Sequence, residues 1–488
     1  MFEPRRIYSA SMTEEVDQTA SRHLLRSDGQ EDLCFGVWYP SNGHSRTTAI
    51  LYDLILPREG ERHVHGNASF TVDYFARSLG TCQAKGGGLA FLHSHPSVGW
   101  QAMSHADKVA EASHAAASAA VTGLPLLGLT LGEDRSWSAR HWFRVARGKY
   151  EPIWCDTVRV VGLGLRLSYH PKQVRRYRLK AEFQRTTDIW GKEAQEHLGR
   201  IHIGICGLGS VGSVVCEVLA RIGIRQVTLI DFDRISSHNL DRTLGATRSD
   251  AKGRTFKTEV AARNAEVSAT ADGFQANRFE FSVVEPNGYS VALDCDLIFS
   301  CVDRPWPRRV LNHLAYAHLI PVIDGGIRVR KSEGKLKSAT WATGTAGPLR
   351  VCLECRGAYD PGLVAVERDG FLEEPSYIER LPETSPLRGN ENVFPLSVSL
   401  AAHEVLQFVA LVTELVGMRD VGEQRFSYFP GIIGVEHLKC DSNCPFPLLT
   451  GLGDRATEKV GAVTGVDRRL AGEGTVTRPV AGKSRIPG

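Results

Sequence analysis

Two histidines and one aspartate near residue 100 have the types and spacing of a metal site. His93 and His95 lie two residues apart after the apolar run 89–92, so both imidazoles leave the same face at the end of a predicted strand. Asp107 follows at the start of a predicted helix. Two neutral imidazoles and a carboxylate can hold zinc and leave its fourth position to water, which is the arrangement that hydrolysis needs.

Four cysteines form a second candidate metal site. Cys352 with Cys355 and Cys440 with Cys444 are two close pairs, with two and three residues between their members. Such pairs favour a closed, structural zinc site, while a redox disulfide and unpaired buried thiols are the alternatives. Most of the other cysteines among the eleven stand singly in apolar segments, where buried reduced thiols are usual.

A glycine-rich turn indicates a nucleotide site. The pattern G-x-G-x-x-G, made by Gly207, Gly209 and Gly212, follows an apolar strand and opens a helix. Its glycines let the backbone approach a phosphate at the helix N-terminus. A second strand, 226–230, ends at Asp231, which is placed to bind a ribose hydroxyl. By itself this pattern fits a nicotinamide dehydrogenase equally well.

The residues after Asp231 resemble those of the ThiF, MoeB and ubiquitin-activating family. The resemblance rests on the stretch from His238 to Arg242, on Lys257 at the start of a helix and on Asp303 after a later strand, and it covers roughly residues 180–448. It implies adenylation of the C-terminal glycine of a ubiquitin-like protein with ATP and magnesium. The implied contacts are Asp231 with the ribose, Asn239, Arg242 and Lys257 with the phosphates, Asp303 with magnesium, and Arg185 with the ATP of a partner subunit.

Adenylation needs cations and a metal, because a carboxylate must attack a negatively charged α-phosphate, and it needs no acid or base. In ubiquitin-activating enzymes a further cysteine between the two pairs accepts the carrier as a thioester. Residues 356–439 contain no cysteine, so we expect no thioester there. Cys301 lies two residues before Asp303, but it ends an apolar strand and is interpreted as a buried thiol.

With Pro96 and Ser104 added, the histidine cluster resembles the JAMM metalloprotease motif of deubiquitinases and of bacterial relatives that trim ubiquitin-like proteins. The resemblance implies that His93, His95 and Asp107 hold the zinc, that Ser104 stabilises the oxyanion and that an upstream glutamate activates water. We favour Glu31 over the adjacent Asp32 for this role. The spacing from His95 to Ser104 is one residue longer than the family pattern, which predicts a rearranged loop.

These sites require two domains of an α/β protein. We expect an α+β JAMM (cytidine-deaminase-like) domain over 1–155, with strands at 48–56 and 127–130 around a helix at 107–121. A Rossmann-like ThiF domain with a mostly parallel sheet follows, because strand, glycine turn, helix and strand come in that order. The remaining expectations are a helical linker and N-terminal arm over 156–195, the adenylating domain over 196–448 with a surface loop at 361–395, and a disordered tail over 449–488.

Composition restricts the function classes. The formal charge of +3 over 488 residues requires neither a nucleic acid nor a membrane as partner. The polar start carries no apolar signal core, and apolar runs such as 123–132 are too short to cross a bilayer, so we expect a cytoplasmic protein.

The sequence therefore predicts a bifunctional enzyme that adenylates a carrier's C-terminal glycine and cleaves after that glycine with zinc. The expected partners are a ubiquitin-like or sulfur-carrier protein, a conjugating-enzyme-like protein and a second copy of the chain. Two alternatives stay open: sulfur-carrier activation for cofactor or metabolite biosynthesis, and a binding scaffold whose peptidase has degenerated.

Overall fold

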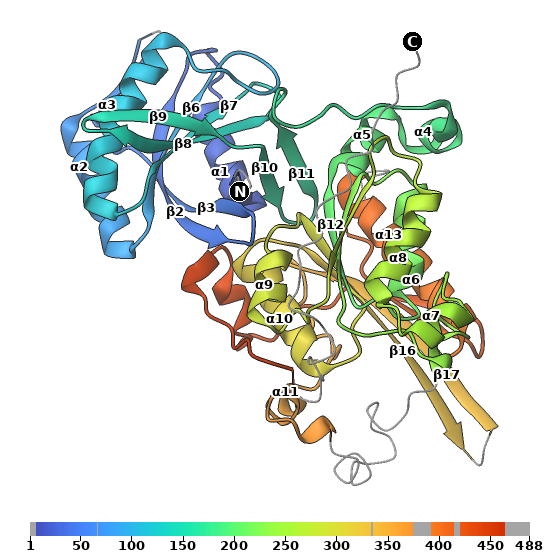
Figure 1. Ribbon diagram of the computed structural model, residues 1–488. Helices are drawn as coiled ribbons and strands as arrows, with labels where there is room; N and C mark the ends of the chain where they lie inside the picture. Colours follow the sequence, from blue (N-terminus) through green and yellow to red (C-terminus); the bar gives the residue numbers. More distant parts are fainter. Residues whose placement is uncertain (1–5, 66, 333–334, 374–391, 414–419, 464–488) are drawn as a thin grey trace.

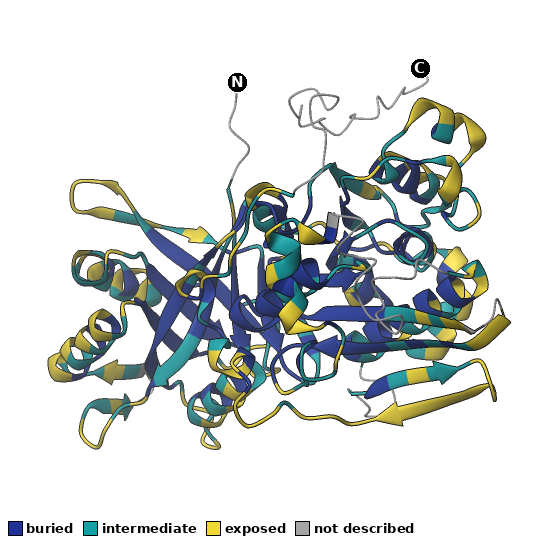
Figure 2. Cartoon of the chain, turned by 90° about the horizontal axis from the view of Figure 1, so that it is seen from below, coloured by how far each residue is buried: buried dark blue, intermediate teal, exposed yellow. Residues whose placement is uncertain are grey.

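A computed structural model of the chain describes residues 6–463, apart from 66, 333–334, 374–391 and 414–419. Two halves lie side by side, the first running from blue to teal and the second from green to red (Figure 1). Each is built on a large sheet whose strands are mostly buried, with exposed residues on the covering helices and hairpin tips (Figure 2).

The N-terminal half has a nine-stranded mixed sheet in the order β11-β10-β1-β3-β2-β6-β7-β8-β9. Helix α1 packs on one face, and α2 and α3 pack on the other, so each face contributes its own apolar cluster. The bounds are β1 Ile7–Thr13, α1 Glu14–Leu24, β2 Leu33–Asn42, β3 Arg46–Ile55, β4 Arg62–His65, β5 Asn67–Phe70, α2 Val72–Lys85, β6 Gly88–Ser94, α3 His105–Thr122, β7 Leu126–Leu131, β8 Trp137–Ala146, β9 Lys149–Trp154, β10 Thr157–Val161 and β11 Leu165–Tyr169.

Helix α3 shows how the sequence fixes local structure at the candidate metal site. Ser104 accepts a hydrogen bond from the Asp107 backbone and Asp107 accepts one from the Ser104 backbone, which is a capping box. The helix ends at Gly123 in the left-handed region, with φ 73°. Two of the residues predicted for catalysis thus also start the helix that carries them.

The prediction of a helical linker over 156–195 is wrong for its first part. β10 pairs parallel with β1, and β11 pairs antiparallel with β10, so the first sheet continues to Tyr169. The β-branched residues of β10 outweigh the charge of Arg159, because that arginine is buried against an acidic partner in the second half. Helices follow later: η1 Ala181–Phe183, α4 Gln184–Trp190 and α5 Lys192–Arg200.

The C-terminal half has an eight-stranded sheet in the order β14-β13-β12-β15-β16-β17-β18-β19. The pairs from β14 to β16 are parallel and those from β16 to β19 are antiparallel, so the parallel sheet predicted from the glycine turn carries an antiparallel extension. The strands are β12 His202–Cys206, β13 Gln226–Ile230, β14 Gln275–Phe279, β15 Leu297–Ser300, β16 Val322–Ser332, β17 Lys335–Ala346, β18 Glu423–Ser427 and β19 Ile432–Glu436.

Helices cover both faces of this second sheet. One core cluster includes residues of α5, α6, α8 and α13, and the other includes residues of α9, α10 and α11. The bounds are α6 Gly212–Arg221, η2 Ser237–Asn239, α7 Arg248–Gly253, α8 Lys257–Ser268, α9 Pro286–Ala292, α10 Pro305–Ala317, α11 Pro361–Arg368, η3 Phe371–Glu373, α13 Phe394–Thr413, η5 Phe446–Leu449 and η6 Gly453–Arg455.

Helix α13 is long and apolar enough to cross a membrane by length and composition. Its buried apolar residues, which include Leu400 and Phe408, belong to the core clusters of the second half. Packing against α6, β16 and β17 accounts for this composition without a bilayer.

Two further expectations need correction. The surface loop predicted at 361–395 contains the helix α11 and the short helix η3, while residues 374–391 lie outside the described part. The tail predicted to be disordered from 449 is ordered up to 463, because Asp454 accepts hydrogen bonds from Asn42 and the Trp306 indole donates to the Lys459 carbonyl. Residues 464–488 lie outside the described range.

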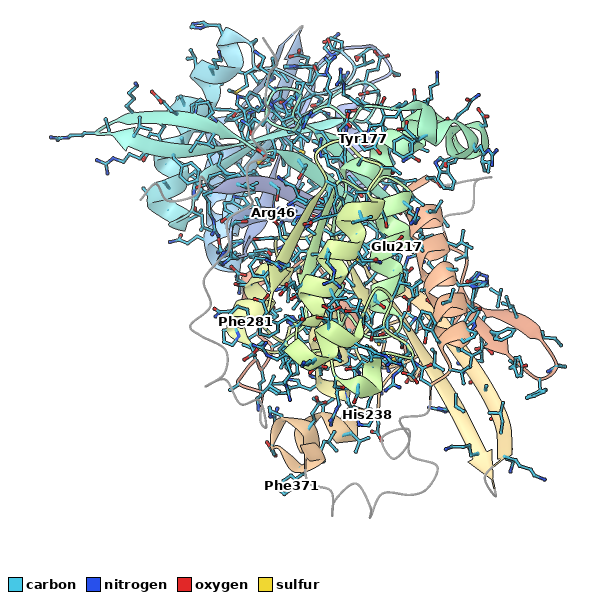
Figure 3. All side chains as sticks on the ribbon, turned by 45° about the vertical axis from the view of Figure 1, so that its right-hand side comes forward. Arg46, Tyr177, Glu217, His238, Phe281 and Phe371 are labelled. Atoms are coloured by element: carbon cyan, nitrogen blue, oxygen red, sulfur yellow. The ribbon has the colours of Figure 1, made fainter. Side chains whose placement is uncertain are left out.

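A buried ion cluster joins the two halves. Asp296, at the edge of β15, pairs with Arg46 at 2.6 Å and with Arg159 at 2.9 Å, and all three side chains are less than a tenth exposed. Arg46 lies at the boundary between the halves in Figure 3. Burial opposes the charge of Asp296, but the two arginines hold the pKa of its carboxyl well below the usual range. Asp296 of the second half is therefore stabilised as a buried anion only while Arg46 and Arg159 of the first half lie beside it, so these ion pairs hold the two halves together.

Candidate functional site

The structure brings His93, His95 and Asp107 together at one point. Their nearest ligand atoms all lie within 4.8 Å of one another. The two Nε2 atoms are 3.2 Å apart, and the Asp107 carboxylate lies 3.3 Å from His95 Nε2 and 3.7 Å from His93 Nε2. The end of β6 supplies both imidazoles and the first turn of α3 supplies the carboxylate.

These separations fit a tetrahedral ion. Zinc–nitrogen bonds of about 2.05 Å at tetrahedral angles put two ligand atoms about 3.3 Å apart. His93 is buried, whereas His95 and Asp107 are partly exposed, so one side of the cluster stays open to solvent. Three ligands with one open side are what a catalytic zinc site requires.

Charges in the cluster favour the ligand forms of the aspartate and of one histidine. Although burial opposes ionisation, hydrogen bonding to His95 and the field of His93 keep the pKa of the Asp107 carboxyl below its ordinary value. Burial, helped by the nearby Arg140, lowers the pKa of His93 well below its ordinary value. Hydrogen bonding to Asp107 raises the pKa of His95.

The structure distinguishes between the two acidic candidates upstream. Asp32 is fully buried, and its carboxylate accepts hydrogen bonds from Arg62 at 2.7 Å and from the Leu33 backbone at 2.8 Å. Glu31 is partly exposed and close enough to His95 and Asp107 to feel both charges. Burial raises the pKa of Glu31, while His95 opposes this shift and Asp107 adds to it. A raised pKa suits a group that accepts a proton near neutral pH, so Glu31 is the better candidate.

The longer loop between His95 and Ser104 is held in place at several points. The Glu133 backbone donates to the Ser97 carbonyl at 2.9 Å, and the Gly99 backbone donates to the Asp134 carboxylate at 2.9 Å. The Trp100 ring packs beside other aromatic rings, 5.1 Å from that of His170. Ser104 is exposed, and because its oxygen accepts the helix-capping bond, its hydroxyl proton is free to donate to a substrate oxygen.

The second predicted site lies at the carboxyl edge of the parallel strands. Gly207 has φ +87°, which favours glycine, and a side chain at Gly212 would overlap the Gly207 carbonyl oxygen. Among the described residues, and apart from the chain neighbours of Gly209, no atom lies within 4 Å of the position that a side chain would take there, so the turn is open at this point. The turn can therefore approach a phosphate closely at the start of α6.

Acidic and basic side chains converge beside this turn. The buried Asp231 accepts hydrogen bonds from the backbones of Leu208 and Asp233, at 2.6 and 2.7 Å. Lys257, at the start of α8, donates to the Asp233 carboxylate at 2.6 Å. Burial opposes the charge of Lys257, but Asp231, Asp233 and Asp303 raise its pKa, so these groups share one electrostatic environment. The sequence reasoning gave no role to Asp233. Its position two residues after Asp231, beyond the same strand, is the pattern that could have placed it in this site.

The other predicted nucleotide residues are less tightly placed. Asn239 accepts hydrogen bonds from the backbone and hydroxyl of Ser236, so its oxygen is used to shape the loop. The Arg242 guanidinium lies 3.1 Å from the Asp241 carboxylate. His238, the residue before Asn239, marks the position of this loop in Figure 3, at the end of the second half opposite to Tyr177.

A cavity of about 730 Å³ opens on the same loop. Its lining includes three cationic side chains, those of Arg248, Lys252 and Arg254. They give this surface a positive field next to the predicted phosphate contacts.

Arg185 does not belong to this cluster. It is exposed on α4, which contacts η1 and α5 and lies far from α7 in Figure 1. Its predicted role, reaching the ATP of a partner subunit, therefore stays a prediction.

The four cysteines meet in the second half, where the segment between β17 and α11 lies against the segment that follows β19. Their sulfur atoms all lie within 4.8 Å of one another, with Cys352 and Cys444 3.5 Å apart, and none of the four is in a disulfide. Backbone amides donate to three of these sulfur atoms, for example the Cys355 amide to the Cys352 Sγ at 3.3 Å. Tetrahedral zinc with 2.3 Å bonds sets sulfur atoms about 3.8 Å apart, so this cluster fits a closed structural ion.

Comparison with known proteins concerns the second half of the chain. Residues 183–371 match the model of the ThiF family, so this segment is similar to a ThiF domain. The match does not reach the N-terminal half, so the JAMM resemblance of that half stays a prediction from the sequence.

Among curated relatives, the Escherichia coli tRNA threonylcarbamoyladenosine dehydratase is 29% identical over 153 residues, which is 30% of this chain and 54% of that protein. The Escherichia coli molybdopterin-synthase adenylyltransferase is 27% identical over 31% of this chain and 59% of its own length. The ubiquitin-like modifier-activating enzyme 5 of Drosophila ananassae is 25% identical over 28% of this chain and 36% of its own length. The matched part of the chain thus spans between 36% and 59% of the length of these relatives.

Among solved structures, a crystal structure of Escherichia coli MccB with MccA-N7isoASN covers 55% of this chain and 75% of its own, at 17% identity and a TM-score of 0.43.

Proposed function

We propose that the C-terminal half adenylates the C-terminal glycine of a ubiquitin-like or sulfur-carrier protein with ATP. The observation that carries this proposal is the ThiF match over 183–371, within which Asp231, Lys257 and Asp303 converge beside the glycine turn. A carboxylate oxygen of the carrier forms a bond to the α-phosphorus, and the bond from that phosphorus to pyrophosphate breaks. The products are the carrier adenylate and pyrophosphate.

Each residue has a part in this step. The amides of the turn and the N-terminus of α6 attract the phosphates, and Lys257 and Arg242 neutralise them once they exchange Asp233 and Asp241 for phosphate oxygens. Asp231 accepts a hydrogen bond from a ribose hydroxyl of ATP. Magnesium, which Asp303 would hold, supplies further neutralisation of the leaving pyrophosphate when bound.

Exchange of labelled pyrophosphate into ATP tests this proposal. Exchange should require a carrier that ends in Gly-Gly, and the Asp303→Asn variant should lose it. If the wild-type protein binds ATP but gives no exchange with any such carrier of its host, the proposal fails.

For the N-terminal half we propose zinc-dependent cleavage of the peptide or isopeptide bond after that glycine, in a JAMM-type domain. The support is the cluster of His93, His95 and Asp107 with one open side, together with Glu31 beside it. A zinc ion held there would polarise the scissile carbonyl and make water acidic enough to attack near neutral pH. Glu31 takes the proton of the attacking water, and Ser104 donates its hydroxyl to the developing oxyanion.

The absence of cysteine from 356–439 favours one outcome for the adenylate that the C-terminal half would form. Without an acceptor thiol in that segment, the adenylate passes to a nucleophile on another protein or to a sulfur donor, as in sulfur-carrier activation. A scaffold with a degenerate peptidase makes a different prediction: one zinc per chain, at the cysteines, instead of two. A homodimer completed by Arg185 and a cytoplasmic location also belong to this proposal.

A further inference from the structure

A basic arm projects from the second half and takes no part in the functions proposed above. The arm is the hairpin of residues 328–340 within β16 and β17, of which 333–334 lie outside the described part. Its sequence holds five cations and one acid, Glu333, which gives it a formal charge of +4, whereas the whole chain carries +3. The rest of the chain is therefore close to neutral. The cations are Arg328, Arg330, Lys331, Lys335 and Lys337.

The charge of the arm is exposed. Arg328 and Arg330 alternate with Val329, which packs against the apolar cluster of α13, so the two arginines leave the opposite face of the hairpin. Lys335 and Lys337 are exposed on the second strand of the arm. Within the described part of the chain, no acidic side chain forms an ion pair with any of these four cations. They are therefore available to a partner outside the chain.

The arm rises from the edge of the sheet that holds the nucleotide residues. Parallel strands end at a shared edge, where the glycine turn follows β12 and Asp303 follows β15. β16 pairs with β15 only as far as Asp324 and then continues through 325–332, which spans about 26 Å. Figure 1 shows β16 and β17 extending past α7. The arm therefore stands beside the route by which a substrate approaches this edge.

Exposed apolar side chains lie next to the arm. The Tyr428 amide donates to the Ala339 carbonyl at 2.9 Å, so the chain that leaves β18 lies against the arm. Tyr428 and Phe429 are 51% and 62% exposed, and their ring centroids lie 4.6 Å apart in an edge-to-face contact. Leu336, on the arm itself, is 45% exposed. Protein interfaces combine aromatic anchors with a polar rim, so this surface has the chemistry of a docking site for a folded protein.

Two classes of partner satisfy this charge, an acidic protein and a nucleic acid, and the proposed reaction favours the protein. The C-terminal carboxylate of the carrier must reach the α-phosphate at the edge from which the arm rises. The folded body of the carrier is too large to enter the site, so it stays outside and beside the arm. A nucleic acid would find little further positive charge, because the rest of the chain is close to neutral.

We propose that the basic arm docks an acidic face of the carrier protein while the C-terminal glycine of the carrier lies beside the glycine turn. This inference rests on the proposed adenylation, because it takes the carrier as the substrate of the second half. Carboxylates of the carrier pair with the cations of the arm, and Leu336, Tyr428 and Phe429 cover an apolar part of the same face. This pairing speeds encounter and holds the carrier without contacting ATP. The arm therefore acts on the affinity for the carrier.

Charge reversal on the arm tests the inference. One variant combines Arg328→Glu with Arg330→Glu. Its matched control combines Arg144→Glu with Arg147→Glu, because these arginines are exposed on the β8–β9 hairpin of the first half and the net charge changes equally. Pyrophosphate exchange at varied concentrations of a Gly-Gly-ending carrier of the host gives KM and kcat. Fluorescence anisotropy measures binding of the labelled carrier, and of a short single-stranded RNA, without ATP. Melting temperature and ATP affinity report on folding.

We expect reversal on the arm to raise both the KM and the Kd for the carrier at least about tenfold, because like charges then face each other. The kcat, the ATP affinity and the melting temperature should stay close to wild type. Added salt should weaken carrier binding to the wild type more than to this variant, because fewer attractive pairs are left to screen. The control variant should stay close to wild type in every measurement.

Wild-type affinity for the carrier in the arm variant overturns the inference, as does an equal loss in the control variant, which would mean an effect of net charge alone. A loss of RNA binding with unchanged carrier binding also overturns it and assigns the arm to a nucleic acid. A wild-type protein that neither binds such a carrier nor exchanges pyrophosphate overturns the proposed adenylation together with this inference. Exchange that the arm variant leaves unaltered overturns the inference alone, so the two failures are distinguishable.

Discussion

The histidine cluster of the first half and the glycine-turn edge of the second differ in how far each is assembled without its ligand. The ligand atoms of His93, His95 and Asp107 already lie close together. The buried ion pair of Glu111 and Arg140, with Thr130 bonded to Arg140, lies beside them. At the glycine turn, Lys257 and Arg242 are instead paired with carboxylates of the chain itself.

The difference follows from what each ligand supplies. An ion brings one point of charge, so its ligands must meet before it binds, whereas ATP brings several charged oxygens that can displace internal partners one by one. The first site should therefore depend on fine geometry and the second on total charge. Four predictions test this contrast, from the largest expected effect to the smallest.

The first prediction separates the two acids beside the cluster. Glu31→Gln should lower the rate of cleavage by about 10²–10⁴-fold with zinc content unchanged, because a proton acceptor is lost and the ligands are not. Asp32→Asn should chiefly lower thermal stability, because that carboxylate is buried against Arg62. Cleavage rate, zinc content and melting temperature are measured on both. A Glu31→Gln enzyme of normal rate would refute the assignment.

The second prediction concerns the charge of the nucleotide edge. Lys257→Ala should lower ATP–pyrophosphate exchange by about 10²–10³-fold, because it removes a preorganised donor from a site where negative charges gather. Zinc content and cleavage should stay unchanged in this variant. Lys257→Arg keeps the charge and should recover part of the exchange. Equal rates for the two variants would show that charge at this position is unimportant.

The third prediction addresses the junction between the halves. Asp296→Ala leaves Arg46 and Arg159 buried without a partner and should lower the free energy of unfolding by about 3–5 kcal/mol. Asp294→Asn is the comparison, because Asp294 accepts hydrogen bonds from neutral groups of Ser45 and from a backbone amide and should cost less. Urea unfolding at pH 7 measures both. Equal losses would mean that the ion cluster is not what holds the halves together.

The fourth prediction is a pH effect at the same junction. Burial lowers the pKa of His318 to about 3 and that of His202 to about 4. Unfolded histidine takes up a proton near pH 6.5, so stability falls from that pH downwards until the folded pKa is reached. For each of these two histidines, the free energy of unfolding of the protein should fall by about 2 kcal/mol between pH 7 and pH 5. In His318→Gln this part of the pH dependence should disappear; an unchanged dependence would contradict the buried, neutral state.

The sequence carried most of the information for the two sites. His93 and His95 stand on one strand, and the spacing of two puts their imidazoles on one face, so the cluster could be predicted before any fold. The glycine turn likewise predicted the strand, helix and strand that the structure has as β12, α6 and β13.

What the sequence did not reveal depends on partners far along the chain. Arg159 and Arg140 look like solvated charges, yet both are buried because Asp296 and Glu111 meet them only in the folded protein. For this reason the sequence alone does not predict that the first sheet continues through β10 and β11. Local periodicity cannot report a charge that a distant element neutralises.

The central claim is that both halves act at one carboxyl-terminal glycine, and intact mass spectrometry of a carrier tests it most directly. The substrate is a Gly-Gly-ending carrier of the host extended by a short peptide, incubated with the zinc-loaded protein, ATP and magnesium. The account predicts that the carrier first loses its extension and then gains the mass of AMP. Asp107→Asn should block the first change on the extended carrier, and Asp303→Asn only the second. A carrier that gains AMP when supplied already trimmed, but that the wild-type protein never trims, would contradict the claim.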